Sequence, residues 1–600
     1  MAAEVERALK VLGAEGDLAI PIEYARDEQF GDYACTVAMD KRVRESCALA
    51  RPEFKNPKVF ASAIGEQLKS CGLFERVEVA GPGFLNLTLA ANVLSETLAE
   101  ARLARDHYGE SQVARPRRIL FEFVSANPTG PLNVVSARAA ALGDSCSNLL
   151  SAVGENVHRE FYVNDFGNQV DLLGHSVLLR YFERCGVPLK FAEKDGDSYQ
   201  YPSGPGLPFP AGGYHGEYLM RAVDAIVQNR AEDLPSAARL EQARLDAASG
   251  DASDPYVQPG PLSEVASTLG RAATDYFLDT QKADLARFRV EFDEFFREST
   301  LHDSGAVMAA SQKLKDSVFE EAGRLLFRST AFGDDKDRVI VREDGRPTYL
   351  LADIAYHESK ISRGYTHIYN IWGPDHHGYI ARLAGAMQAL GFPADQFRVL
   401  IAQQVNLLDG GQQVRMSKRA GRVITMSELL DEIPTDVVRY FFVMRSFESH
   451  LDFDLSEARD TSEKNPYYYV AYAHARIRSI FSRASERGLL PAEPESAVSK
   501  LELTPERRRL LWLVARFPEE VYDAARSLEP HRLVNYLYAL ATALSRFYGP
   551  RENRIIEQDG PTAGALLAIL EGVALCLKNG LALLGMEAPE RMVREDEPEA

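Results

Sequence analysis

The chain has 600 residues, of which 46% are hydrophobic and 26% are charged, so it has the composition of a soluble globular protein with more than one domain. Its first residues, MAAEVERALK, are too charged for a signal peptide, and we find no uninterrupted apolar stretch long enough to span a bilayer, so a cytoplasmic protein without a membrane partner is expected. The net charge of −19 excludes a generally basic surface, although local basic patches could still bind nucleic acid.

Three regions follow one another along the chain. Residues 1–112 combine helical periodicity with a β ending, VEVAGPGFLNLTL, which predicts an α+β domain. In residues 113–455, apolar runs typical of buried parallel strands alternate with helical segments, which predicts a Rossmann-type parallel-sheet domain. Residues near 190–262 are rich in Gly, Pro, Ser, Ala and Asp and are interpreted as an insertion. Residues 456–600 are helical nearly to the end, so the fold class is multidomain α/β with an all-α C-terminal domain.

Polar, glycine-containing clusters follow the predicted strands. ILFEFV is followed by SANPTGPLN, REFYV by NDFGNQ, HIYNIW by GPDHHG, and RVLIAQQV by a glycine turn. In open α/β sheets, ligands bind beyond the carboxyl ends of the strands. One such cluster is commonplace, but their recurrence predicts a site at this edge of the sheet.

Glu122 interrupts a run that otherwise reads as a strand buried on both faces. A buried carboxylate is costly unless it meets a cation or several hydrogen-bond donors. Two interpretations remain open at this point. Either Glu122 lies in a site that supplies a cation, or its strand is at the sheet edge and Glu122 faces water.

Two further segments could handle a polyphosphate. A helix is expected from about Val134, after a turn at Gly130 and Pro131, and its free N–H groups would favour phosphate oxygens. Residues 414–421, VRMSKRAG, follow a glycine turn and combine cations with small residues, as in a mobile loop that closes over phosphates. Each signal is weak by itself, and a solvated basic turn would explain the second.

Together, these segments resemble the paired motifs of class I aminoacyl-tRNA synthetases. ANPTGPLNVVSAR occupies the place of the HIGH motif and RMSKR that of the KMSKS motif. The flanking residues resemble the arginyl-tRNA synthetase family, through FEFVSANPTGP, YVNDFGNQ, GYHGEYL, FRSTAFGDDKDRV, TYLLADIAYH, WGPDHHGYIARL and TDVVRYFF. DEQFGDYACTVAM with VEVAGPGFLNLTL is similar to the tRNA-contacting extra domain of that family, and NPYYYVAYAHARIRSIF to the start of its anticodon-binding domain. The resemblance implies ATP-dependent ligation of L-arginine to its tRNA through an arginyl-adenylate, with release of AMP and diphosphate.

The resemblance also implies an arginine site. Glu122 and Asp353 would face the guanidinium with Tyr349 beside them, and Asn127 would hold the α-amino or carboxylate end. Carboxylates match a planar guanidinium bidentately, and two of them would discriminate against lysine by geometry as well as charge. On this interpretation the cation that Glu122 needs is the substrate itself. A helix cap is the alternative role for Asp353.

The implied catalytic residues are Asn133, Ser136 and Lys418, with Lys418 on the departing pyrophosphate. The attack of the arginine carboxylate on the α-phosphate needs positioning and charge stabilisation rather than a protein nucleophile. ATP would enter with Mg²⁺ as a substrate, and no tightly bound cofactor is expected. The full implied ATP-binding set is Gly130, Pro131, Asn133, Ser136, Asp375, His376, Arg415, Met416, Ser417 and Lys418.

No metal site is predicted. The six cysteines include no CxxC pair, which argues against zinc and against a disulfide framework. The adjacent His376 and His377 suggest a metal at first sight, but sequence neighbours rarely converge on one ion.

Both motifs depart from the family pattern. The positions of the HIGH histidines and glycine hold Asn133, Ser136 and Val135, so both imidazoles are missing and a β-branched side chain stands where adenine would lie close to the backbone. In the second motif, Arg415 and Arg419 replace a lysine and a serine. The alternative to an active enzyme is therefore a catalytically silent, tRNA-binding paralogue. The retained arginine-site residues favour the enzyme.

At the C-terminal end, aromatic and basic residues are mixed, as base stacking and phosphate contacts require. Tyr467, Arg476 and Arg478 are the candidate tRNA-binding residues, although tyrosines at helical spacing are also typical of a core. The expected partners are tRNA(Arg), L-arginine and ATP, and the resemblance suggests a monomer.

Overall fold

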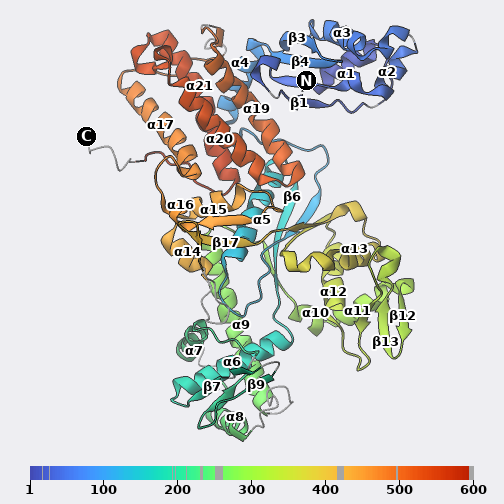
Figure 1. The fold of residues 1–600 in the computed structure, drawn as a ribbon, viewed down its shortest axis with the longest axis vertical. Helices are drawn as coiled ribbons and strands as arrows, with labels where there is room; N and C mark the ends of the chain where they lie inside the picture. Colours follow the sequence, from blue (N-terminus) through green and yellow to red (C-terminus); the bar gives the residue numbers. More distant parts are fainter. Residues whose placement is uncertain are drawn as a thin grey trace.

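The computed structural model describes residues 1–592 except residues 17, 26, 50, 192, 196–197, 211, 230–233, 250–260, 415–423, 495–497 and 500. Figure 1 shows an α+β domain and a helical bundle at one end, a parallel sheet in the middle, and two smaller modules beyond it. The predicted multidomain α/β class is confirmed, with the parallel sheet central and the C-terminal part all-helical.

The N-terminal domain is a four-stranded antiparallel sheet in the order β1-β2-β4-β3, covered by helices on one face. Leu85, Leu87 and Leu89 alternate along β4, and the intervening Asn86 and Thr88 are buried as well, so β4 is covered on both faces. A further helix, α4, leaves the sheet and packs on the helical bundle. The elements are α1 Ala2–Val11, β1 Ile22–Tyr24, β2 Tyr33–Cys35, α2 Lys41–Ala48, α3 Pro57–Leu68, β3 Phe74–Ala80, β4 Phe84–Leu89 and α4 Ala91–Ala104.

The central sheet has five parallel strands in the order β11-β6-β5-β15-β16. Its middle strand, β5, is buried on both faces, which explains the continuous apolar run that precedes Glu122. The elements of this region are β5 Arg118–Glu122, α5 Val134–Ala152, β6 Asn156–Val163, β11 Glu294–Arg297, α12 Tyr349–Ser362, β15 His367–Trp372, α13 Ile380–Ala389 and β16 Phe397–Ile401.

A side module lies between β11 and α12 in the chain, and a second small sheet follows β16. The side module contains α10 Ser299–Asp303, α11 Ala306–Lys313, β12 Val318–Glu321, β13 Arg324–Phe327 and β14 Arg338–Val341. After β16 come β17 Val405–Asp409, β18 Gln412–Gln413, α14 Met426–Glu432, α15 Thr435–Val443, β19 Leu451–Asp454 and α16 Leu455–Arg459. The predicted run RVLIAQQV is therefore split between β16 of the central sheet and β17 of the second sheet, and the glycine turn follows β17.

The insertion forms a module with its own hydrophobic core, which includes Phe182, Phe209, Leu219 and Phe277. Part of this core comes from the helices α6 and α9, which connect the module to the central sheet (Figure 1). Its elements are α6 Asn168–Arg184, β7 Leu189–Phe191, β8 Glu193–Asp195, β9 Ser198–Gln200, β10 Leu207–Phe209, α7 Tyr218–Asn229, α8 Ala237–Ser249 and α9 Pro261–Arg287.

The C-terminal bundle consists mainly of α17 Pro466–Glu486, α19 Pro505–Ser527, α20 Pro530–Phe547 and α21 Gly560–Leu583. Among the described residues, α21 alone is long and apolar enough to cross a membrane, with a mean hydropathy of 1.8 over its best window. Glu571 interrupts α21, so this helix is not the uninterrupted apolar stretch whose absence the sequence indicated. The other three helices surround α21, and 72% of that window is buried, so bundle packing accounts for its apolar character.

Candidate active site

The order of the central strands places a ligand site at the carboxyl end of β5. The chain passes from β5 to β6 on one side, while β15 lies on the other side, so the strand order reverses between β5 and β15. Ligands of open α/β sheets bind at such a switch point. The loop after β5, residues 123–133, and the turn after β15, residues 373–379, both border it. The sequence prediction of a site at the strand ends agrees with this topology.

The loop after β5 begins with an unfavourable turn. Val124 has φ 68° and Ser125 has φ 41°, and neither residue type normally adopts this left-handed region. The turn is held by the Ser125 hydroxyl, which donates to Glu122 Oε1 at 2.9 Å and accepts from the backbone N–H of Tyr162 at 3.1 Å. This segment is therefore fixed to both β5 and β6.

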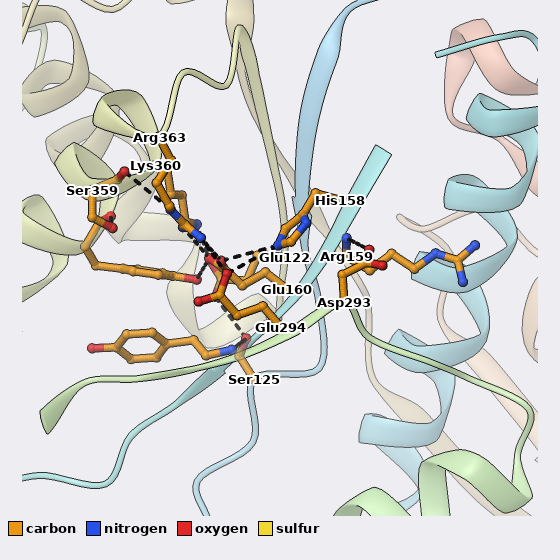
Figure 2. Close-up of polar contacts among 12 residues, drawn as sticks. Glu122, Ser125, His158, Arg159, Glu160, Asp293, Glu294, Ser359, Lys360 and Arg363 are labelled. Carbon is orange, nitrogen blue, oxygen red and sulfur yellow. Dashed lines mark hydrogen bonds and ion pairs between the residues drawn. The ribbon is translucent and has the colours of Figure 1, made fainter. Parts of the chain in front are cut away.

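Glu122 is buried, with 6% of its surface exposed, and its cation is supplied by the protein itself. Lys360 Nζ, on the fully buried face of α12, donates to Glu122 Oε2 at 2.6 Å (Figure 2). The edge-strand interpretation of Glu122 is wrong, because β5 is the middle strand. The idea that Glu122 must obtain its cation from the substrate is also wrong, because Lys360 already neutralises it.

A second buried carboxylate, Glu160, is partnered in the same way. It lies beside Glu122 in the register of β5 and β6, accepts from the Tyr356 hydroxyl at 2.6 Å, and pairs with Arg363 at 2.6 Å. Glu294 lies next to Glu160 on β11 and also pairs with Arg363, at 2.8 Å. We call Glu122, Glu160, Glu294, Lys360 and Arg363 the polar layer. Burial raises the pKa of Glu160, but Arg363 and Lys360 lower it by more than burial raises it. The pKa of Glu160 is therefore below its ordinary value.

His357 lies beside the polar layer and is held in one protonation state by Asp353 and Asn370. Its Nδ1 is 2.9 Å from the Asp353 carbonyl oxygen, and its Nε2 is 2.9 Å from the amide nitrogen of Asn370. This pairing requires Nδ1 to donate and Nε2 to accept, which is the neutral imidazole. Burial, with the charge of Lys360, holds the pKa of His357 well below its usual value, in agreement with that tautomer.

Asp353 and Glu298, which we call the carboxylate pair, have a different charge balance. Asp353 lies on α12 and accepts a 2.5 Å hydrogen bond from the Tyr379 hydroxyl. Glu298 directly follows β11, is 5% exposed, and hydrogen-bonds Tyr162 and His302. Among the described residues, neither carboxylate pairs with a lysine or arginine.

The pKa values of the pair reflect this missing charge. The pKa of Asp353 is raised to about 7, chiefly by burial; the hydrogen bond from Tyr379 lowers the pKa, and the nearby charge of Glu298 raises it. Burial likewise raises the pKa of Glu298. Tyr349, at the start of α12 and one turn before Asp353, is 62% exposed. A cation that entered here would therefore meet two poorly compensated carboxylates beside an accessible phenol.

Thr425 and Met426, which follow the second motif segment in the chain, meet the first motif at the start of α5. Met426 N–H donates to the Leu132 carbonyl at 2.8 Å, and Asn133 and Thr425 form an isolated antiparallel bridge. The predicted residues Arg415, Met416, Ser417 and Lys418, with Arg419, lie outside the described residues. The chain that leaves them nevertheless returns to the loop that carries Gly130 and Pro131.

Asn133 caps α5. Its Oδ1 accepts from Ser136 N–H at 3.0 Å and lies 3.3 Å from Ser136 Oγ. The side-chain oxygen Oδ1 of Asn133 is therefore engaged, while the side-chain nitrogen Nδ2 can still donate. The Asn133 side chain is exposed. One turn later, Arg138 is fully buried and donates to the carbonyls of Gln403, Ser446 and Ser449, which fixes the helix in place.

The remaining predicted residues are located as follows. Asp375, His376 and His377 are exposed on the turn after β15, beside the switch point. The Asn127 side chain donates to Gln169 at 2.6 Å, so the structure gives it a protein partner. Gly130 lies against the ring of Tyr218.

One group of described residues has ligand atoms spaced as a metal site requires, namely His158, Glu160 and Glu294. The Arg363 guanidinium occupies the space between both carboxylates, which argues against a bound cation there (Figure 2).

Two of the three candidate tRNA contacts are on the surface. Arg476 is exposed and stacks over Tyr548 at 4.6 Å, and exposed Arg478 donates to Glu590 at 2.6 Å. Tyr467 is only 6% exposed, and its hydroxyl donates to Asp436. The prediction for Tyr467 is therefore contradicted, because its ring belongs to the core and cannot stack on a base.

Three residues were missed from the sequence. Lys360 and Arg363 follow Asp353 and Tyr356 at intervals of three or four residues, so all four lie on one side of α12. Helical spacing alone does not identify the carboxylates that pair with Lys360 and Arg363. Glu298 could have been found, because the polar cluster REST directly follows the apolar residues Phe295 and Phe296, as polar residues follow the other strands.

Comparison with known protein families gives a consistent result over nearly the whole chain. Residues 1–89 match the arginyl tRNA synthetase N terminal domain, residues 98–185 the class I (R) tRNA synthetase catalytic domain, and residues 470–592 the DALR anticodon binding domain. The arginine–tRNA ligase of Leptospira interrogans is 44% identical over 583 residues, which is 96% of this chain and 94% of that protein. The Moorella thermoacetica arginine–tRNA ligase is 41% identical over 95% of this chain and 93% of its own length. The arginyl-tRNA synthetase structure from Thermus thermophilus shares the fold, with a TM-score of 0.70, 22% identity, and coverage of 98% and 99%.

Proposed function

The chain belongs to the arginyl-tRNA synthetase family, and from that premise we propose which of its residues hold arginine, ATP and tRNA. It is a class I arginine–tRNA ligase, which activates arginine with ATP and transfers it to tRNA. The carboxylate pair at the β5–β15 switch point carries the assignment of the arginine site.

The carboxylate pair binds the guanidinium. Asp353 and Glu298 lack an internal lysine or arginine partner among the described residues, and a guanidinium can satisfy both with bidentate hydrogen bonds. Exposed Tyr349 offers a further contact. Glu122 does not contact the guanidinium directly. It is neutralised by Lys360 and holds the turn at Ser125, and this turn places Asn127 beside the α-amino and carboxylate end of the substrate.

ATP binds between the start of α5 and the turn after β15. Gly130, Pro131, Asn133 and Ser136 form one wall, and Asp375 and His376 form the other. The free amide of Asn133 and the α5 amino end favour the phosphates in place of imidazoles. Lys418, which lies outside the described residues, contacts the pyrophosphate that leaves. Mg²⁺ enters with ATP as a substrate complex, held through phosphate oxygens and water.

Arg476 and Arg478 contact the tRNA from the exposed face of α17. We further propose that the protein acts as a monomer in the cytoplasm without a membrane partner. The burial of α21 within the bundle supports the last point.

Charging assays test this function. Purified protein is incubated with ATP, total tRNA and each amino acid in turn, and acid-stable aminoacyl-tRNA is measured. Charging with arginine alone is expected. Tight tRNA binding with no charging would instead identify a silent paralogue and overturn the proposal.

A further inference from the structure

The tip of the loop that carries the predicted ATP residues is held by the inserted module. Gln281, on α9, is only 1% exposed, and its side-chain amide donates to the Asn127 carbonyl at 3.2 Å and to the Gly130 carbonyl at 2.9 Å. These two carbonyls bracket the tip of the loop. A single buried amide thus fixes the backbone on both sides of Thr129.

Two tyrosines from the motif GYHGEYL act on the same tip. The Tyr214 side chain hydrogen-bonds that of Thr129, and its backbone N–H donates to Ser176 Oγ at 3.0 Å within the module. The Tyr218 ring lies so close to Gly130 that a Cβ there would be 3.2 Å from ring atom Cε2. The close approach explains a glycine at this position, because Gly130 does not have a left-handed backbone that would require one.

The module is rigidly joined to the catalytic region through α6 and α9. A Cβ on Gly174 would be 1.8 Å from the Ala266 carbonyl oxygen, and one on Gly270 would be 2.5 Å from that of Val170. The two helices therefore touch backbone to backbone. Such close packing makes the pair a stiff support rather than a flexible tether.

The far end of α9 reaches α14, the helix that follows the second motif segment in the chain. Arg287 pairs with Asp431 at 2.6 Å and donates to the Leu430 carbonyl at 2.6 Å, both on α14. Helix α14 begins just after residues 415–423 and is bonded to Leu132 through Met426. One helix thus contacts the loop after β5 and α14, the helix that follows the second motif segment in the chain.

We propose that the inserted module is a positioning device for the ATP-binding loop, with Gln281, Tyr214 and Tyr218 as its positioning residues. The module holds the tip of the loop in one conformation, so that the start of α5 meets the ATP phosphates without an ordering cost at each turnover. This inference rests on the proposed function of the loop and assigns the module a role in ATP binding.

The test compares Gln281→Leu and Tyr214→Phe with a control, Tyr276→Phe. Tyr276 lies on the same helix and packs on the same core. Loss of two hydrogen bonds should raise the KM for ATP about tenfold in Gln281→Leu, and loss of one should raise it about threefold in Tyr214→Phe. The control should stay at the wild-type KM, and the KM for tRNA should not change in any variant.

The split between ATP and tRNA distinguishes positioning from general damage. A purely structural effect would lower the active fraction and kcat while leaving the KM for ATP unchanged, and that result in both variants would overturn the inference. If Gln281→Leu does not fold, as judged by its melting curve, the milder Tyr214→Phe decides. Wild-type protein that fails to charge tRNA overturns the proposed function instead, and direct titration with ATP then measures the same affinity differences without charging.

Discussion

The polar layer and the carboxylate pair both lie beside α12, but they differ in how their buried negative charges are compensated. In the polar layer, Glu122 and Glu160 meet Lys360 and Arg363, and the pKa of Glu160 is lowered. In the carboxylate pair, Asp353 has no such partner among the described residues and its pKa is raised to about 7. A complete set of charges indicates a structural role, whereas an incomplete set indicates a place for a ligand.

The largest expected effect separates the two regions by activity. Asp353→Asn should lower kcat/KM for arginine by about a hundredfold or more, because one partner of a buried charge pair with the substrate is lost. It should not lower the melting temperature, since the folded protein no longer carries a poorly compensated buried charge. The exposed Asp395→Asn serves as the control. Arginine kinetics near wild type would remove Asp353 from the site.

The next variant should do the reverse and act on stability. Glu122→Gln strands the Lys360 ammonium, which is 0% exposed, at an expected cost of about 3 kcal/mol in the free energy of unfolding. Thermal melting is the measurement. Adding Lys360→Met to the same chain should recover most of the loss, because an apolar pair can replace a buried ion pair. A double variant no more stable than Glu122→Gln would mean that the two side chains do not form a pair.

The pH dependence of arginine binding sharpens the same contrast. Since the pKa of Asp353 is raised to about 7, its carboxylate is present above that pH and lost below it. The KM for arginine should therefore rise about tenfold between pH 8 and pH 6, in line with the falling ionised fraction. The sign for stability is opposite: a raised folded pKa favours the folded state at low pH, and this contribution disappears as the pH rises through about 7. The change in KM should be absent in Asp353→Asn.

The smallest expected effect lies at the rim of the polar layer. Glu294 is half exposed, and Arg363 keeps Glu160 as a partner when Glu294 is removed. Glu294→Gln should therefore cost less than about 1 kcal/mol of stability and leave the KM for arginine unchanged. A loss as large as that of Glu122→Gln would show that the rim and the buried centre of the layer are equivalent.

Much of the architecture could be predicted from local pattern. Continuous apolar runs identified β5, β6 and β15 as parallel strands, and the polar clusters after them predicted the edge at which we propose the site. The helical periodicity after residue 456 predicted the bundle. Patterns of this kind are visible because each follows from which faces of one element are covered, and no distant contact has to be known.

The sequence by itself determined the strands, the polar clusters that follow them and the unusual position of Glu122 in an apolar run. Whether a strand is buried can be predicted from the strand's own residues. It could not determine the partner of Glu122, because Lys360 is 238 positions away and only the packing of α12 on β5 brings the two together. The same holds for Tyr467, whose burial depends on neighbouring helices, and for Gln281, which acts on a loop 151 residues earlier. The tertiary structure alone decided which carboxylate pairs with a lysine or arginine of the protein and which has no such partner among the described residues. Charge compensation depends on distances in space.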